Sequence, residues 1–104
     1  MLLLAALPAG CIDHDHEIAV QNCGNQEILV DVQKEYGPWS VRRDDHEQTP
    51  VLGFSAWVGH YTSQIEKITI VVWRKSDGTL LYANRFRESD FGDYHNHIVI
   101  PVYP

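Results

Sequence analysis

Apolar and polar side chains alternate along most of this chain, and a period of two residues predicts β-strands. The clearest strand is expected over residues 65–75, where isoleucine and valine recur on one face. A second run follows at 80–86, after the dipeptide Asp77-Gly78. Asp-Gly between two such runs is a strong hairpin signal, because both positions of a tight turn need residues that tolerate positive φ. The pattern therefore predicts a β-hairpin centred on this dipeptide.

The length of the hairpin loop sets which side chains lie opposite each other. With a two-residue loop, Trp73 would face Tyr82 across the strands, and Val72 would face Ala83 in the core. Val71, Trp73 and Tyr82 would then share the outer face of the sheet. Exposed aromatic side chains are common in recognition surfaces, so these three residues form a candidate patch for a partner. The alternative is that another segment covers them as ordinary core.

The N-terminal half contains a second alternating pair of runs, at 18–21 and 28–33. The intervening stretch is rich in turn-forming residues, so a first hairpin is expected here, with Gly24 or Asn25 at positive φ. The middle of the chain is less regular. One short edge strand is expected at 39–41, followed by a solvated charged run at 42–47.

Later segments supply the remaining elements. Residues 51–61 predict a strand interrupted at Gly53 and Gly59 by a bulge or a close backbone approach. A single helical turn is expected within 89–94, with Phe91 and Tyr94 closing one end of the domain. The last strand begins at His97 and contains Pro101, which places it at an edge or turns that position away from its neighbour. Its inward side chains would be Ile98, Ile100 and Val102.

Six or seven short strands with no long helix predict an all-β fold: a small antiparallel β-sandwich of immunoglobulin-like or transthyretin-like type, over residues 17–104. The chain has 104 residues, and its three tryptophans and five tyrosines are typical of a folded domain. The formal net charge is −6, and basic residues do not cluster. Binding to a phosphate backbone needs such clusters, so the charge pattern argues against nucleic acid as a partner.

The N-terminal residues indicate a cellular location rather than a secondary-structure element. An apolar run ends in Leu7-Pro8-Ala9-Gly10 directly before Cys11, and this arrangement resembles the end of a bacterial lipoprotein signal. Residues 1–10 would be a signal remnant, Cys11 the lipidated first residue, and 11–16 an acidic, histidine-containing tether. Because the run lacks a preceding Lys or Arg, the true start is expected upstream. Two alternatives remain: an apolar N-terminus packed on the domain, and a disulfide between Cys11 and Cys23.

The order of these features resembles small cell-envelope lipoproteins of Bacteroidota: a lipidated cysteine, an acidic tether, a strong apolar strand such as 65–70 and a last strand ending at Tyr103-Pro104. The resemblance implies lipid anchoring through Cys11 at the outer membrane or cell surface. It also implies a β-sandwich, but no activity. A partner would be another envelope protein or a glycan.

Histidine is the residue type with suggestive spacing for chemistry. His14 and His16 flank one residue, as do His95 and His97, and in a strand such pairs project to one side. If the first and last strands pair, the four imidazoles could bind Zn²⁺ or Cu²⁺. No nucleophile motif, phosphate loop or cofactor fingerprint accompanies them. The sequence therefore favours a non-catalytic envelope binding or accessory module without a cofactor, with an envelope metal-binding protein as the alternative.

Overall fold

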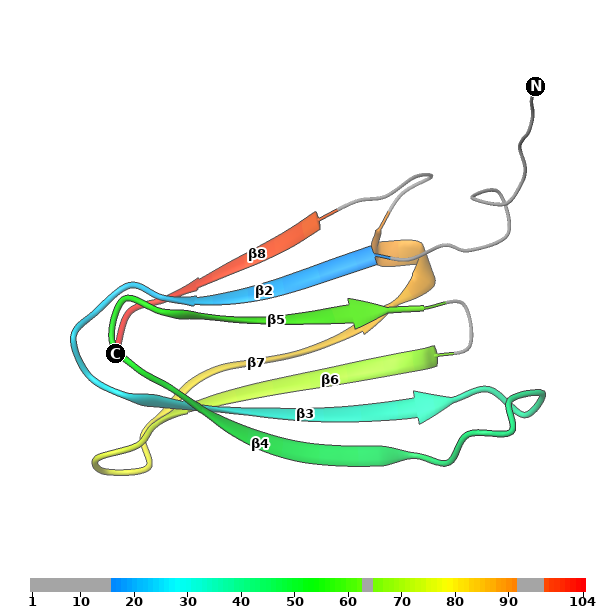
Figure 1. Ribbon diagram of the computed structural model, residues 1–104, viewed down its shortest axis with the longest axis horizontal. Coiled ribbons are helices and arrows are strands. Elements are labelled where there is room, and N and C mark those ends of the chain that lie inside the picture. The colour runs from blue at the N-terminus through cyan, green and yellow to red at the C-terminus, as the bar shows by residue number, and fades with distance from the viewer. Residues whose placement is uncertain (1–15, 63–64, 92–96) are drawn as a thin grey trace, which may run out of the picture.

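Two β-sheets pack face to face in the computed structural model of this protein, which describes residues 16–62, 65–91 and 97–104 (Figure 1). The described residues form seven strands and one 3₁₀ turn: β2 (His16–Asn22), β3 (Ile28–Tyr36), β4 (Asp45–Val51), β5 (Ala56–Tyr61), β6 (Ile65–Arg74), β7 (Leu80–Arg87), η1 (Glu88–Asp90) and β8 (His97–Val102).

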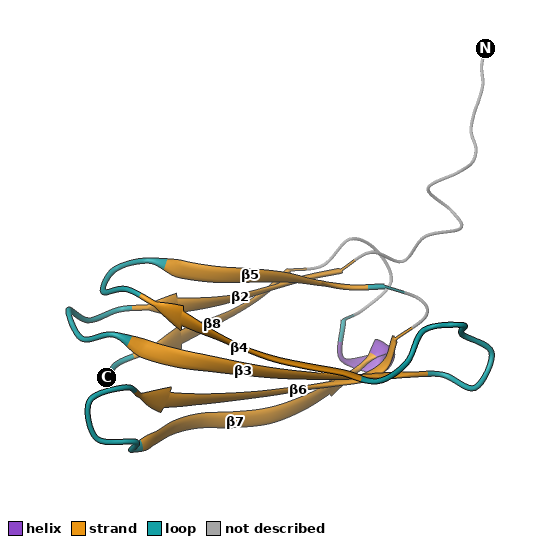
Figure 2. Ribbon diagram, turned by 60° about the horizontal axis from the view of Figure 1, so that its bottom comes forward, coloured by secondary structure: helices purple, strands orange, loops and turns teal. Residues whose placement is uncertain are grey.

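One sheet has three strands in the order β5-β2-β8, and the other has four in the order β4-β3-β6-β7. All neighbours are antiparallel except β2 and β8, which run parallel. The predicted all-β sandwich is therefore confirmed, and the first and last strands of the described residues, β2 and β8, do pair. β2 and β3, which follow each other in the chain, lie in different sheets (Figure 2).

The core lies between the sheets and comes from the apolar alternation seen in the sequence. Ile18 and Val20 of β2 face Val30 of β3 and Ile70 of β6, and all four are fully buried. Burying each such side chain contributes about 1.5–3 kcal/mol relative to leaving it exposed. The complete core set is Ile18, Val20, Ile28, Val30, Val32, Val51, Tyr61, Ile65, Ile68, Ile70, Val72, Phe86, Phe91, Ile100 and Val102.

The predicted first hairpin is wrong. β2 and β3 do not pair, because the chain crosses from one sheet to the other between them. Neither Gly24 nor Asn25 has positive φ; among the described residues only Phe54 and Gly78 do. A Cβ atom at Gly24 would instead lie 2.8 Å from the Pro104 ring. Glycine is needed there because the C-terminal end passes close by.

The β6–β7 hairpin is confirmed, but its register differs by one residue from the prediction. Val72 lies opposite Tyr82 and Val71 opposite Ala83, with a register shift between Val72 and Trp73. The loop is longer than two residues, because the Arg74 N–H donates to the Thr79 carbonyl at 2.8 Å. Gly78 supplies the positive φ, at 72°.

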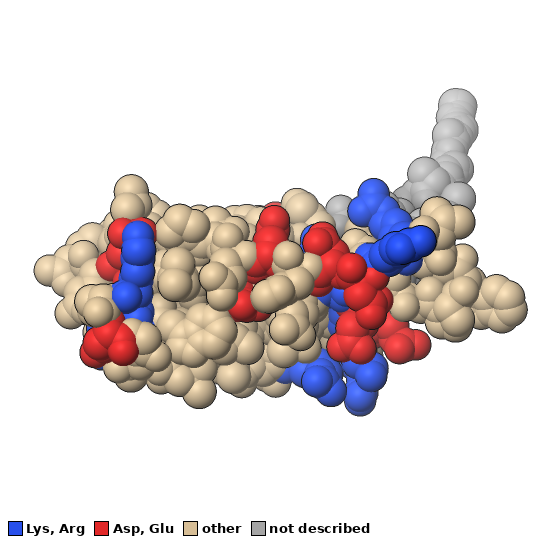
Figure 3. Space-filling model, turned by 90° about the horizontal axis from the view of Figure 1, so that it is seen from below, with Lys and Arg blue, Asp and Glu red and all other residues tan. Residues whose placement is uncertain are grey.

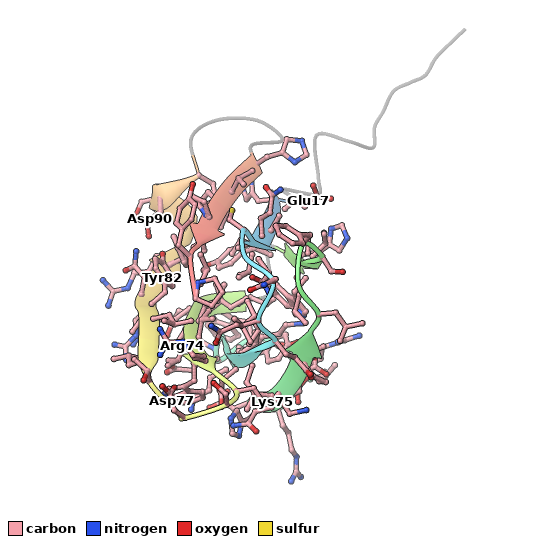
Figure 4. All side chains as sticks on the ribbon, turned by 90° about the vertical axis from the view of Figure 1, so that its left-hand side faces the viewer. Glu17, Arg74, Lys75, Asp77, Tyr82 and Asp90 are labelled. Atoms are coloured by element: carbon pink, nitrogen blue, oxygen red, sulfur yellow. The ribbon has the colours of Figure 1, made fainter. Side chains whose placement is uncertain are left out.

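Asp77 fixes the shape of this loop. Its carboxylate accepts from the Thr79 N–H at 3.0 Å and from Arg74 Nη1 at 2.8 Å. These hydrogen bonds, the one from the Thr79 N–H first, lower the pKa of Asp77 below its usual value. Figure 4 looks onto this end of the sandwich, where Arg74, Lys75 and Asp77 gather.

The middle of the chain also departs from the prediction. No strand forms at 39–41, and Trp39 is 96% exposed. The strand is β4 instead, whose first four side chains are all exposed. As an edge strand it pairs only with β3, so it needs no apolar alternation, and its charged sequence concealed it.

Phe91 closes one end of the core, as predicted, while Tyr94 lies outside the described residues. Phe91 follows η1 and is 2% exposed. Its ring stacks on His16 with centroids 4.5 Å apart and contacts Tyr61 at 4.8 Å. His16 is itself buried as the first residue of β2, so its expected place in the tether of residues 11–16 is wrong.

The two glycines at 53 and 59 mark close approaches. A Cβ at Gly53 would lie 2.8 Å from the Asn25 backbone, which confirms the expected backbone contact. A Cβ at Gly59 would lie 2.2 Å from the Trp57 ring, which covers this position. Trp57 in turn packs against the core.

Replacing Gly59 with alanine should therefore displace the Trp57 ring. We expect a loss of about 1–3 kcal/mol in the free energy of unfolding, as for other overpacked sites, measured by urea denaturation. In a Trp57→Ala background the same substitution should cost far less, because the clash is gone. An equal cost in both backgrounds would contradict this explanation.

Candidate functional site

The paired histidines do not form a common cluster in the described structure. His16 points into the core against Phe91, whereas the His97 side chain lies on the outer face of the three-stranded sheet and is 63% exposed. The two rings are therefore on opposite faces of the sheet. His14 and His95, the other two candidate ligands, lie outside the described residues. Although β2 and β8 pair in parallel, with Glu17 opposite His97, the imidazoles of His16 and His97 do not meet.

His97 forms a hydrogen bond with Glu17 rather than with another histidine. The His97 Nδ1–H donates to Glu17 Oε1 at 2.9 Å, across the β2–β8 pair. His60 on β5 lies opposite Glu17 from the other side. Over residues 16–62, 65–91 and 97–104, no three or more His, Cys, Asp or Glu side chains are placed to hold a metal ion.

The predicted aromatic patch is divided by the observed register. Tyr82 lies opposite the buried Val72 and packs against the core, so it leaves the patch. Trp73 and Val71 remain together on the outer face of the four-stranded sheet, because they alternate with the buried Ile70 and Val72. Trp73 lies opposite Leu80 rather than Tyr82.

The outer face gathers further apolar residues around Trp73 that the sequence did not indicate. Leu29 on β3 pairs with Trp73 on one side and with Pro50 of β4 on the other. Val71 and Ala83 form the next row. Leu80 is 57% exposed. We call this set the Trp73 patch: Leu29, Pro50, Val71, Trp73, Leu80 and Ala83. Figure 3 shows uncharged surface on this side of the molecule, between charged groups at one end and acidic groups near the middle.

A buried carboxylate lies beside the patch. Asp31 is 4% exposed although it faces outward from β3. The His46 Nε2–H donates to its carboxylate, 2.8 Å from each oxygen, and Gln48 Nε2 donates at 3.0 Å. Both donors come from β4, so this cluster ties the charged edge strand to β3. An ionised carboxylate with such donors can be buried without a large penalty.

Sequence reasoning missed the Asp31 cluster because the two donors, His46 and Gln48, follow Asp31 by 15 and 17 residues. They lie in β4, whose first residues fall in the expected solvated run of 42–47. A signal was present in hindsight: Asp31 interrupts the apolar strand of residues 28–32. A charged residue at that place needs a partner in the folded state. The identity of the partners depended on the β3–β4 register, which only the structure supplies.

Comparisons with known proteins return no relative: no family model, no curated protein and no solved structure matches this chain. Within the described part, no helix has the length and apolar character required to cross a bilayer. Cys11 and the residues before it lie outside that part.

Proposed function

We propose that this chain is a non-catalytic binding or accessory module of a bacterial cell envelope, attached to the membrane by lipid on Cys11. The residues 7–11 support the anchor, since they resemble a lipoprotein processing site. The Trp73 patch supports the binding role, because it is a group of apolar residues on a sheet face that no described element covers.

The chemistry of the patch favours a protein partner over a glycan. Carbohydrate sites place hydrogen-bonding groups around an aromatic ring. The neighbours of Trp73 in its own row are Leu29, Pro50 and Leu80, all apolar. Such a row matches the apolar centre of a protein interface, with the charged groups of Arg74, Lys75 and Asp77 at its rim.

Photo-crosslinking in the native cells tests the binding role. A photoreactive side chain at position 80 should give one dominant adduct, and Trp73→Ala should remove at least about 90% of it, as expected for loss of a central aromatic contact. A photoreactive side chain at position 103 is the matched control, since Tyr103 is 73% exposed and follows β8 in the other sheet. Equal adducts from both positions, or an adduct that Trp73→Ala leaves intact, would contradict the proposal.

Mass spectrometry of the mature N-terminus tests the anchor separately. A diacyl or triacyl adduct on Cys11 is the expected result. An intact Met1, or a disulfide between Cys11 and Cys23, would overturn the lipid attachment while leaving the binding test unaffected.

A further inference from the structure

The loop between β3 and β4, residues 37–44, carries the two most exposed large apolar side chains of the described structure. Trp39 is 96% exposed and Val41 is 98% exposed, whereas the other exposed large apolar residues lie between 51% and 74%. Arg42 and Arg43 follow directly. Among the described residues, no carboxylate lies within ion-pair distance of either arginine. An exposed tryptophan beside two such arginines is typical of a segment that binds a membrane interface.

Hydrogen bonds within this loop hold its tip in a defined shape. The Ser40 N–H donates to the Gly37 carbonyl at 3.0 Å, which closes a β-turn with Pro38 and Trp39 at its centre. Ser40 Oγ accepts from the Arg42 N–H at 3.0 Å. Proline at the second position of a turn fixes its φ. The loop therefore presents Trp39 to the outside with little conformational entropy left to lose when it meets a partner.

The loop lies at the end of the sandwich where β2 begins. His16 of β2 is opposite Tyr61 of β5, and the Tyr61 hydroxyl donates to the Glu66 carbonyl at 2.8 Å, near the start of β6. The first residue of β6 is opposite Tyr36, the last residue of β3. β2 therefore starts at the end where the 37–44 loop leaves β3, and two views of the ribbon show the loop projecting there (Figure 1, Figure 2).

This position relates the loop to the lipid that the proposed function places on Cys11. Cys11 precedes His16 by five residues, and five residues of fully extended chain span at most about 18 Å. A lipid on Cys11 would therefore hold this end of the domain close to the bilayer. Tethering raises the effective concentration of the loop at the membrane surface, so that even a weak contact becomes populated.

We propose that the 37–44 loop binds an anionic lipid surface as a second membrane contact beside the Cys11 anchor, a role that rests on the proposed lipid attachment. The Trp39 ring and the Val41 side chain enter the boundary between headgroups and acyl chains, where tryptophan is favoured. The guanidinium groups of the two arginines that follow contact lipid phosphates, to which arginine offers bidentate hydrogen bonds.

The acidic residues of the chain do not prevent this contact. The net charge is −6, but at physiological ionic strength a charge more than about 8–10 Å from the lipid is largely screened. Asp44, the next residue after the arginines, turns back toward β3, where its carboxylate accepts from the Tyr36 N–H at 3.1 Å. Figure 3 shows basic and acidic groups gathered at this end and an uncharged tip that projects beyond them. The uncharged tip therefore reaches the bilayer ahead of the carboxylates.

A contact at this end leaves the opposite end of the sandwich in solvent. The Asn22 N–H, at the far end of β2, donates to the Ser55 carbonyl at 2.9 Å, so the 52–55 connection with Phe54 lies away from the membrane. The Trp73 patch, on the outer face of the four-stranded sheet, takes no part in the lipid contact. It stays available to a protein partner.

Fluorescence quenching by brominated lipid tests the loop contact. The full chain carries Cys23→Ser and is coupled through Cys11 to a maleimide lipid, in vesicles of phosphatidylcholine and phosphatidylglycerol with or without bromine on the acyl chains. Bromine should quench the emission of this parent, because Trp39 lies in the bilayer interface. A Trp39→Phe variant, which keeps Trp57 and Trp73, should lose the bromine-dependent quenching. A parent that is not quenched, or equal quenching in both chains, would overturn the proposal.

Arg43→Gln tests the contribution of charge. The loss of one positive charge beside an anionic surface should lower the ratio of docked to undocked loop by about fivefold, seen as weaker quenching. Lys75→Gln is the matched control, because it removes the same charge from an exposed residue at the opposite end, where the Lys75 N–H donates to the Glu27 carbonyl. It should be quenched like the parent, as should Phe54→Ala.

An equal loss of quenching in Arg43→Gln and Lys75→Gln would show that overall charge, rather than the loop, governs the contact, and would overturn the proposal. Circular dichroism verifies that every variant is folded. Because the lipid is attached chemically in this test, its outcome is separate from the mass of the native N-terminus. Failure of the loop contact and failure of the lipid attachment are therefore distinguishable.

Discussion

Exchanging Asn22 for aspartate is expected to cost about 3–5 kcal/mol in the free energy of unfolding, although the two side chains have the same shape. Asn22 is fully buried at the end of β2. Its amide nitrogen lies 2.7 Å from the Gln26 carbonyl oxygen, 3.2 Å from that of Leu52 and 3.3 Å from that of Val51. A carboxylate would turn this donor into an acceptor facing three other acceptors.

The cost of Asn22→Asp should depend on pH in a defined direction. Burial and the carbonyl oxygens raise the pKa of the introduced carboxyl above its value in the unfolded chain. The penalty is therefore full above the folded-state pKa and shrinks as the pH falls toward the unfolded-state value, where a neutral carboxylic acid can donate one hydrogen bond. Urea denaturation at several pH values measures this.

Asn25→Asp is the matched control, because it makes the same chemical change on an exposed residue of the same connection. Its effect should stay within about 0.5 kcal/mol. Equal stability losses at positions 22 and 25 would mean that the Asn22 hydrogen bonds do not hold the connections between the sheets.

Removing the Phe91 ring should have an effect of similar size. Phe91 is 2% exposed and contacts His16, Tyr61 and Phe86 at one end of the core. Phe91→Ala is expected to cost about 3–5 kcal/mol, because the cavity cannot be filled from a 3₁₀ turn. A domain of this size has a total stability of about 5–15 kcal/mol, so a substantial unfolded population should result.

Thermal and urea unfolding measure the effect of Phe91→Ala. Phe54→Ala removes the same ring from a loop position that is 74% exposed, and it should change stability by no more than about 0.5 kcal/mol. A Phe91→Ala variant as stable as Phe54→Ala would show that Phe91 does not close the core.

Some of the candidate site could be read from the sequence and some could not. The apolar alternation of 65–75 correctly placed Val71 and Trp73 on one face, but Tyr82 was assigned to that face by assuming a two-residue loop. The real loop runs from Arg74 to Thr79, and this moved Tyr82 to the core side. Strand periodicity is two, so a shift of one residue reverses the face of every side chain that follows.

The burial of Asn22 also could not be predicted from the residues around it in the sequence. Its neighbours in the sequence are turn formers, and the segment was expected to close a hairpin between the first two strands. The structure buries Asn22 because β2 and β3 diverge into separate sheets and the 52–55 connection passes over it. The turn-forming residues do lie in a connection between strands. The backbone groups that Asn22 binds at residues 51 and 52, however, are about 30 residues away in the sequence.

The sequence by itself determined that this protein is an all-β sandwich and which residues alternate into its core. For the last strand it left two alternatives, an edge position or a Pro101 that faces away from its neighbour, and the structure shows that β8 is an edge strand. Only the tertiary structure decided which strands share a sheet, where the charged edge strand β4 lies, and which residues surround Trp73 on the outer face. The physical reason is that side-chain alternation is a local property that fixes which face is buried. Strand pairing depends on contacts between distant segments, and local patterns do not distinguish one suitable partner from another.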